Sequence, residues 1–113
     1  EGDIVVKIIE DGKQRDIHIK EGEMFLLPRC TPHSPQRGPN TIGLVIERYR
    51  ASTEKDACMW FCENCSNKLY EEFFSLEDIV GQLPIVMNNF YANLDLRTCK
   101  KCGSVMEPPP TVA

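Results

Sequence analysis

The sequence has no long apolar run and no excess of positive charge. Lys and Arg number 13 against 17 Asp and Glu, a formal net charge of −4. No stretch approaches the roughly 20 consecutive apolar residues that cross a bilayer as a helix. Nucleic-acid-binding proteins grip phosphates with a basic face, which an acidic chain does not favour. We therefore expect neither a membrane nor a nucleic acid among the partners of this protein.

Glycine and proline show no repeating pattern. The 113 residues contain 7 Gly and 8 Pro without any period, which excludes a collagen-like or low-complexity chain. Hydrophobic residues make up 42% of the chain, an ordinary share for a globular domain. A chain of this size buries only a modest core, so a metal or a partner would help to hold it.

The first half of the chain predicts β structure. Asp11-Gly12 is a hairpin signal between two segments rich in β-branched or alternating apolar residues. The four prolines from Pro28 to Pro39 predict an ordered loop with little ladder pairing. Strands this short, at this spacing, favour an antiparallel barrel or sandwich. The expected strands are residues 4–9, 15–20, 24–27 and 41–49.

The second half has a different character, which begins with a polar connection at residues 52–56. Residues 68–74 fit a strand or a helix equally well. Ser75 to Asp78 resembles the start of a helix, and apolar residues follow at helical spacing. Pro84 is expected to kink or split that helix, because proline removes an internal hydrogen bond. The tail, residues 104–113, is predicted to be disordered.

Four of the six cysteines form two C-x-x-C pairs, Cys62 with Cys65 and Cys99 with Cys102. Such pairs place two sulfurs in one turn, and two turns complete a tetrahedral thiolate site. The alternative is a disulfide framework of a secreted protein, which the absence of a leader before Glu1 disfavours. We therefore predict a four-cysteine metal site with zinc or iron, both of which four thiolates suit.

The remaining cysteines, Cys30 and Cys58, have no partner at metal-ligand spacing and are expected to be small buried hydrophobes. The chain has two histidines. His18 lies between Ile17 and Ile19 in a strand pattern, so it is expected on the opposite, solvent-facing side. His33 lies in a proline-rich loop, where it is either a metal ligand or a structural hydrogen-bonding residue.

The spacing Gly22-x5-Pro28-x-Cys30-x2-His33 resembles the second motif of the cupin superfamily, with Cys30 in place of a glycine. The longer stretches 22–28, 32–37 and 41–48, together with both cysteine pairs, resemble the 3-hydroxyanthranilate 3,4-dioxygenase family. The cysteine pairs resemble those of its microbial and fungal type, which carries a second, rubredoxin-like iron.

The resemblance implies a mainly β fold, a cupin-like antiparallel barrel or jelly roll that is incomplete at its N-terminus. A small C-terminal helix and a four-cysteine metal region would follow it. The implied division is residues 1–50 for the C-terminal part of the cupin barrel, 51–103 for the subregion with the cysteine site, and 104–113 for the tail.

The resemblance also implies a reaction. The family opens the ring of 3-hydroxyanthranilate with O2 at a non-haem Fe²⁺, and 2-amino-3-carboxymuconate semialdehyde then gives quinolinate on the kynurenine pathway to NAD. His33 would be a ligand of the catalytic iron, Arg37 would bind the substrate carboxylate, and Glu47 would accept a proton from the substrate. The alternative without a functional role is that Arg37 is a solvated charge in a loop, and that Glu47 and Arg48 are an ordinary pair of charged residues at the end of a strand.

Two of the three catalytic iron ligands have no counterpart. Gly2-Asp3 resembles the end of the first cupin motif, whose Glu ligand would precede Glu1, with a second His further upstream. A facial iron site needs three fixed ligands. We therefore expect a fragment of a longer gene product that has no activity alone, although its four-cysteine site is complete.

Two other functions compete with the enzyme. One is a non-catalytic, cupin-like metal-binding module that acts through protein partners, and the other is a zinc-ribbon nucleic-acid binder, which the net charge disfavours. Free thiolates and the absence of a leader predict a cytoplasmic location. Enzymes of the resembled type are often homodimers.

Overall fold

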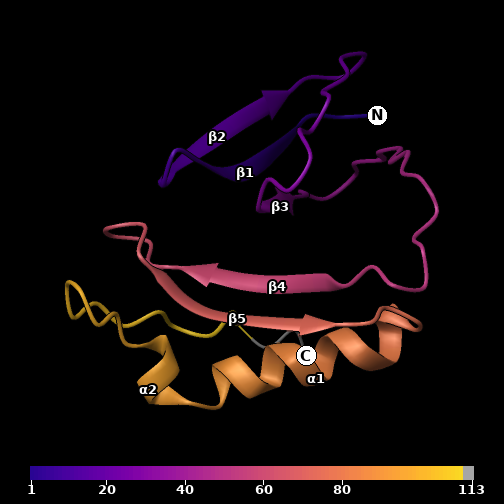
Figure 1. The fold of residues 1–113 in the computed structure, drawn as a ribbon. Coiled ribbons are helices and arrows are strands. Elements are labelled where there is room, and N and C mark those ends of the chain that lie inside the picture. Colours follow the sequence, from indigo (N-terminus) through magenta and orange to yellow (C-terminus); the bar gives the residue numbers. More distant parts are fainter. Residues whose placement is uncertain (111–113) are drawn as a thin grey trace. The chain divides into compact units, whose positions relative to one another are not determined.

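The computed structural model describes residues 1–110 and divides the chain into two compact units, Glu1–Tyr49 and Arg50–Ala113. The last three residues of the predicted tail, 111–113, lie outside the described part. Figure 1 shows the elements of both units along the sequence. Each unit has its own sheet, and each is described by itself.

The first unit is a three-stranded antiparallel sheet of order β2-β1-β3. Its strands are β1 (Ile4–Glu10), β2 (Lys13–Ile19) and β3 (His33–Gln36). The predicted hairpin is confirmed, because Asp11 and Gly12 take φ values of 51° and 75° between β1 and β2. Two consecutive positive φ values match the twist of the paired strands.

One face of this sheet carries the core of the unit. Val6 and Ile8 on β1 are 7% and 3% exposed. Residues directly opposite each other in a ladder point to the same face. Ile17 and Pro35 are opposite Val6, and His33 is opposite Ile8, so all of them lie on the same face of the sheet, where Pro35 and His33 are exposed.

The strands predicted at residues 24–27 and 41–49 are wrong, because neither segment forms a ladder in the described part of the chain. The predicted loop contains β3 instead, so its expected lack of pairing is also wrong at residues 33–36. Apolar alternation does not make a strand without a neighbour to pair with. Large side chains in these segments are exposed, among them Met24, Leu26, Leu44, Ile46 and Tyr49.

The second unit combines two antiparallel strands with two helices. These are β4 (Asp56–Phe61), β5 (Lys68–Phe74), α1 (Ile79–Tyr91) and α2 (Leu94–Arg97). Residues 68–74 are thus a strand. Asp78 caps α1 through its side chain, which accepts a hydrogen bond from the Val80 N–H at 3.2 Å. Pro84 does not split α1, which continues to Tyr91.

An aromatic cluster forms the core of the second unit. Phe90 of α1 is fully buried and stacks on Trp60 of β4, with ring centroids 4.5 Å apart. Tyr70 of β5 stacks on the same phenylalanine at 6.0 Å, and the Trp60 indole N–H donates to the Tyr91 hydroxyl at 3.1 Å. These contacts fix α1 on one face of the β4-β5 pair (Figure 1).

The open antiparallel sheets, the small C-terminal helices and a four-cysteine cluster confirm the predicted mainly β, incomplete cupin-like fold. The prediction for Cys30 is wrong, since this residue is exposed and has φ of 58°, while Cys58 is half-buried rather than buried. His18 is exposed, as predicted. No helix within residues 1–110 is long and apolar enough to cross a membrane.

Candidate metal centre and substrate residues

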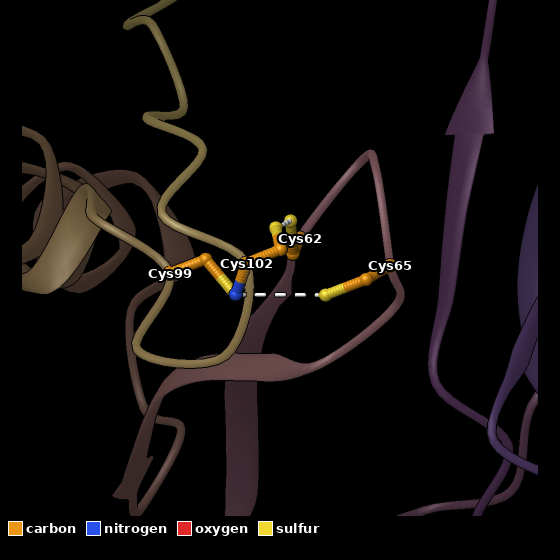
Figure 2. A group of neighbouring side chains, drawn as sticks. All are labelled: Cys62, Cys65, Cys99 and Cys102. Atoms are coloured by element: carbon orange, nitrogen blue, oxygen red, sulfur yellow. Dashed lines mark hydrogen bonds between the residues drawn. The ribbon is translucent and has the colours of Figure 1, made fainter.

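Four cysteines from two turns that are far apart in the sequence lie close together in the second unit, as Figure 2 shows. Cys62 directly follows β4, Cys65 lies in the turn before β5, and the other pair follows α2. All four sulfurs lie within 4.8 Å of one another. The Cys62 and Cys102 sulfurs are 3.5 Å apart, and those of Cys65 and Cys99 are 3.6 Å apart.

The two turns share one backbone design. In each, the first cysteine accepts a hydrogen bond at its carbonyl from the N–H four residues on, at 2.8 Å for Cys62 and 2.9 Å for Cys99. That fourth residue takes a positive φ in both turns, 64° at Ser66 and 80° at Gly103. Glycine enters this conformation without strain, whereas serine does so at some cost. The first cysteine's own N–H is also bonded, so both turns are closed.

The donor set fits a tetrahedral metal ion. With metal–sulfur bonds of about 2.3 Å, the sulfurs of such a site are about 3.8 Å apart. The distances found here are close to that value, and Cys62 and Cys99 are each only 2% exposed. Protein sulfurs would fill all four positions and leave none for a substrate, which is the arrangement of a structural site.

The close packing of the four thiols changes their protonation. Hydrogen bonds from Asn64 and Ser104 lower the pKa of Cys102 to about 5. At Cys65 the Asn67 backbone N–H lowers the pKa, but burial and the neighbouring thiols outweigh it and raise the pKa to about 12. Thiols this close do not all ionise unless a positive charge balances them.

His33 is the first residue of β3, lies on the same sheet face as Ile8, and is exposed. Its Nδ1 is 3.0 Å from the carbonyl oxygen of Thr31. A carbonyl only accepts hydrogen bonds, so Nδ1 carries the proton and the lone pair lies on Nε2. Because the residue is exposed, a neutral ring of this tautomer offers Nε2 as a metal ligand.

Arg37 follows the end of β3, four residues after His33. Its guanidinium lies against Gly43, where a Cβ would be 2.5 Å from the Arg37 Nη1. The guanidinium can therefore occupy this position only because residue 43 has no side chain. Glu47 lies in the exposed segment after Gly43, outside any ladder.

Within residues 1–110, His33 belongs to no group of three or more possible metal ligands. Among residues 1–110, the only group of three or more His, Cys, Asp or Glu ligand atoms close enough to share an ion is the four-cysteine cluster. A facial iron site needs three ligands, so the described residues do not fit the catalytic iron. Glu21 and Glu23 are instead bound to the backbone N–H groups of Gly2 and Lys20.

Sequence reasoning missed Asn64, Asn67 and Ser104, whose side chains form hydrogen bonds with the cysteine sulfurs. The Asn67 amide donates to the Cys99 sulfur at 3.7 Å, and the Ser104 hydroxyl oxygen accepts from the Cys102 thiol at 3.3 Å. The available signal for Asn67 and Ser104 was positional, because each of the two comes five places after the first cysteine of its pair.

Comparison with known proteins gives one consistent family. The sequence model of the family described as 3-hydroxyanthranilic acid dioxygenase matches residues 1–91. A 3-hydroxyanthranilate 3,4-dioxygenase of Xanthomonas campestris pv. campestris (strain B100) is 50% identical over 113 residues, which is all of this chain and 64% of the relative. The chain thus spans slightly less than two thirds of that relative.

Two eukaryotic proteins with the same name are also similar. The one from Neurospora crassa is 42% identical over 109 residues, 96% of this chain and 61% of the relative. The one from Xenopus tropicalis is 47% identical over 100 residues, 88% of this chain and 36% of the relative. The second cysteine pair lies beyond the residues that the family model matches but inside the Xanthomonas alignment.

Proposed function

The chain belongs to the 3-hydroxyanthranilic acid dioxygenase family, and on this premise we propose that it forms part of a non-haem Fe²⁺ ring-cleaving dioxygenase. The substrates would be 3-hydroxyanthranilate and O2, and the product 2-amino-3-carboxymuconate semialdehyde, the precursor of quinolinate and NAD. The observation that carries the proposal is the family match over residues 1–91, which include His33, Arg37 and Glu47.

The substrate roles follow from the chemistry of these side chains. A planar guanidinium binds a carboxylate through two parallel hydrogen bonds, so Arg37 would hold the carboxylate of the substrate. A glutamate beside the substrate hydroxyl or amino group would accept its proton, which is the role we propose for Glu47. Both residues are exposed and can be reached by a small molecule.

The iron chemistry requires more than residues 1–110. His33 would donate Nε2 to the catalytic Fe²⁺, but one imidazole does not define an open facial site. We therefore propose that the chain alone does not turn over 3-hydroxyanthranilate, and that the other ligands come from residues that are not in this chain.

A chimaera tests this proposal. The chain replaces the matching 113 residues of the Xanthomonas campestris protein, and ring cleavage is followed by product absorbance. We expect turnover that His33→Ala abolishes and Arg37→Ala weakens through KM, while His18→Ala, on an exposed strand position, has no effect. An inactive chimaera that folds and binds iron would contradict the proposed function.

We further propose that Cys62, Cys65, Cys99 and Cys102 hold a second iron or a zinc ion that stabilises the second unit. Metal content of the purified chain tests this directly. Cys62→Ser should lose the ion, whereas Cys30→Ser should keep it, since Cys30 is exposed and lies in the other unit. One ion per chain in Cys62→Ser would contradict this assignment.

A second candidate function remains for the chain by itself. Its cysteine cluster is complete whereas His33 lies outside any such group, which favours a non-catalytic metal-binding module acting through protein partners if the chimaera is inactive. A cytoplasmic location stays a prediction from the free thiolates, and a homodimer stays a prediction from the resemblance.

A further inference from the structure

The residue that closes each cysteine turn also reaches a sulfur with its side chain. The Asn67 carbonyl accepts the Cys62 N–H at 2.7 Å, and its Nδ2 is 3.7 Å from the Cys99 Sγ. The Ser104 carbonyl accepts the Cys99 N–H at 2.7 Å, and its Oγ is 3.3 Å from the Cys102 Sγ. Two positions that are equivalent in the two turns therefore perform the same two tasks.

We propose that Asn67 and Ser104 are positioning residues of the four-cysteine centre, whose side chains donate hydrogen bonds to the Cys99 and Cys102 sulfurs and thereby set the affinity of the metal ion and, for iron, its reduction potential. This inference rests on the proposed metal centre. It assigns a role to side chains that do not bind the ion themselves.

The charge of the centre explains why it needs such donors. Four thiolates around a divalent ion carry a net charge of −2. Cys99, the partner of Asn67, is only 2% exposed, whereas Cys102, the partner of Ser104, is exposed. Burial of uncompensated charge is costly, and N–H or O–H donors aimed at sulfur reduce that cost. A metal-bound thiolate has no proton to donate, so the Ser104 hydroxyl must be the donor in that pair.

Asn67 has an additional effect because its bond crosses between the turns. Its backbone closes the first turn, and its amide reaches a ligand of the second turn, 32 residues away. The same Nδ2 is also 3.3 Å from the Lys68 carbonyl, which holds the amide in place. Asn67 therefore joins the two halves of the ligand set before an ion arrives.

Substitution of these side chains removes little else. The backbone carbonyls of positions 67 and 104 would still close their turns, and the Cys102 N–H would still reach the Cys99 Sγ at 3.5 Å. A change in metal binding therefore reports the side-chain donors. Loss of such outer partners typically weakens metal affinity about 10- to 100-fold.

The test uses the full chain and Co²⁺ as the probe. Chelator competition gives the affinity, and the sulfur-to-cobalt charge-transfer band gives the electron density on the ligands. We expect Asn67→Ala and Ser104→Ala each to weaken Co²⁺ binding about tenfold or more and to move the band to lower energy. Ser104→Thr keeps the hydroxyl and should restore both values, and Asn88→Ala, at an exposed position of α1, is the control.

The midpoint potential of the iron-loaded chain provides a second measurement. Hydrogen bonds to sulfur stabilise the more negative, reduced state, so both alanine variants should have a more negative midpoint potential than the unsubstituted chain. Unchanged affinity, band and potential in both variants would overturn the inference, as would losses that Ser104→Thr does not restore. Failure of the unsubstituted chain to bind Co²⁺ as a four-thiolate complex would overturn the metal centre itself.

Discussion

The Arg37 guanidinium occupies the space that a side chain at Gly43 would need. An added Cβ would be 2.5 Å from Arg37 Nη1, whereas Gly38 has no atom within 4 Å of its added Cβ. We expect Gly43→Ala to displace the guanidinium and to raise KM for 3-hydroxyanthranilate in the chimaera by about tenfold, the effect of about 1.4 kcal/mol of lost binding. Steady-state kinetics of Gly43→Ala and of the control Gly38→Ala checks this. Equal KM values would contradict the role of position 43.

The aromatic cluster makes Phe90 the central residue of the second unit. Phe90→Ala removes a fully buried ring that stacks on two others, so we expect a loss of about 3–5 kcal/mol in the free energy of unfolding. Trp60 is the only tryptophan of the chain, so its fluorescence reports urea unfolding of this unit directly. Phe73→Ala, at a side chain that is 57% exposed, is the matched control and should cost far less.

The hydrogen bond between Tyr70 and Glu72 should make the contribution of the Tyr70 hydroxyl to stability depend on pH. The Tyr70 hydroxyl at 2.7 Å and the Asn89 amide at 3.0 Å donate to the Glu72 carboxylate and hold its pKa below the ordinary value of 4.5. A lowered carboxyl pKa adds stability above the unfolded-state pKa, and this is lost as pH falls through the folded-state value. Tyr70→Phe should therefore be less stable at pH 7, with the difference shrinking below pH 4.5.

Urea titrations of the two proteins at several pH values measure this difference. A difference that stays constant from neutral to acidic pH would show that the Tyr70 hydroxyl acts through packing alone.

Metal removal should destabilise the second unit selectively. An ion that binds only the folded chain, at 100 times its Kd, adds about 2.7 kcal/mol. Chelation should therefore lower the unfolding midpoint that Trp60 reports, while amide exchange in the β1-β2 hairpin of the other unit stays unchanged. Equal loss of protection in both units would show that the ion stabilises more than its own unit.

Local patterns account for much of what could be predicted. The Asp11-Gly12 turn was predictable because a hairpin closes between neighbouring residues, and its two positive φ values come from the residue types themselves. The cysteine pairs predicted their own turns for the same reason. The start of a helix near residues 75–78 was also a local signal, although the cap is Asp78 rather than Ser75 and the acidic residues precede the first turn.

The residues at 24–27 and 41–49 show where local patterns fail. Their apolar content resembles strands, yet a strand exists only where another strand accepts its hydrogen bonds, and neither segment has a ladder within residues 1–110. The pairing of β3 with β1 was equally invisible, because a proline-rich loop does not indicate that His33 will lie opposite Ile8.

For this protein, then, the sequence alone determined the family, the mainly β class, the hairpin and the identity of the four thiolates. Only the tertiary structure decided that the sulfurs lie within 4.8 Å of one another, that Gly43 leaves room for Arg37, and that Asn67 reaches Cys99. The physical reason is distance along the chain. Turns and caps are formed by residues that are neighbours in the sequence. The other contacts join residues far apart in the sequence, so they depend on how the strands, helices and loops pack.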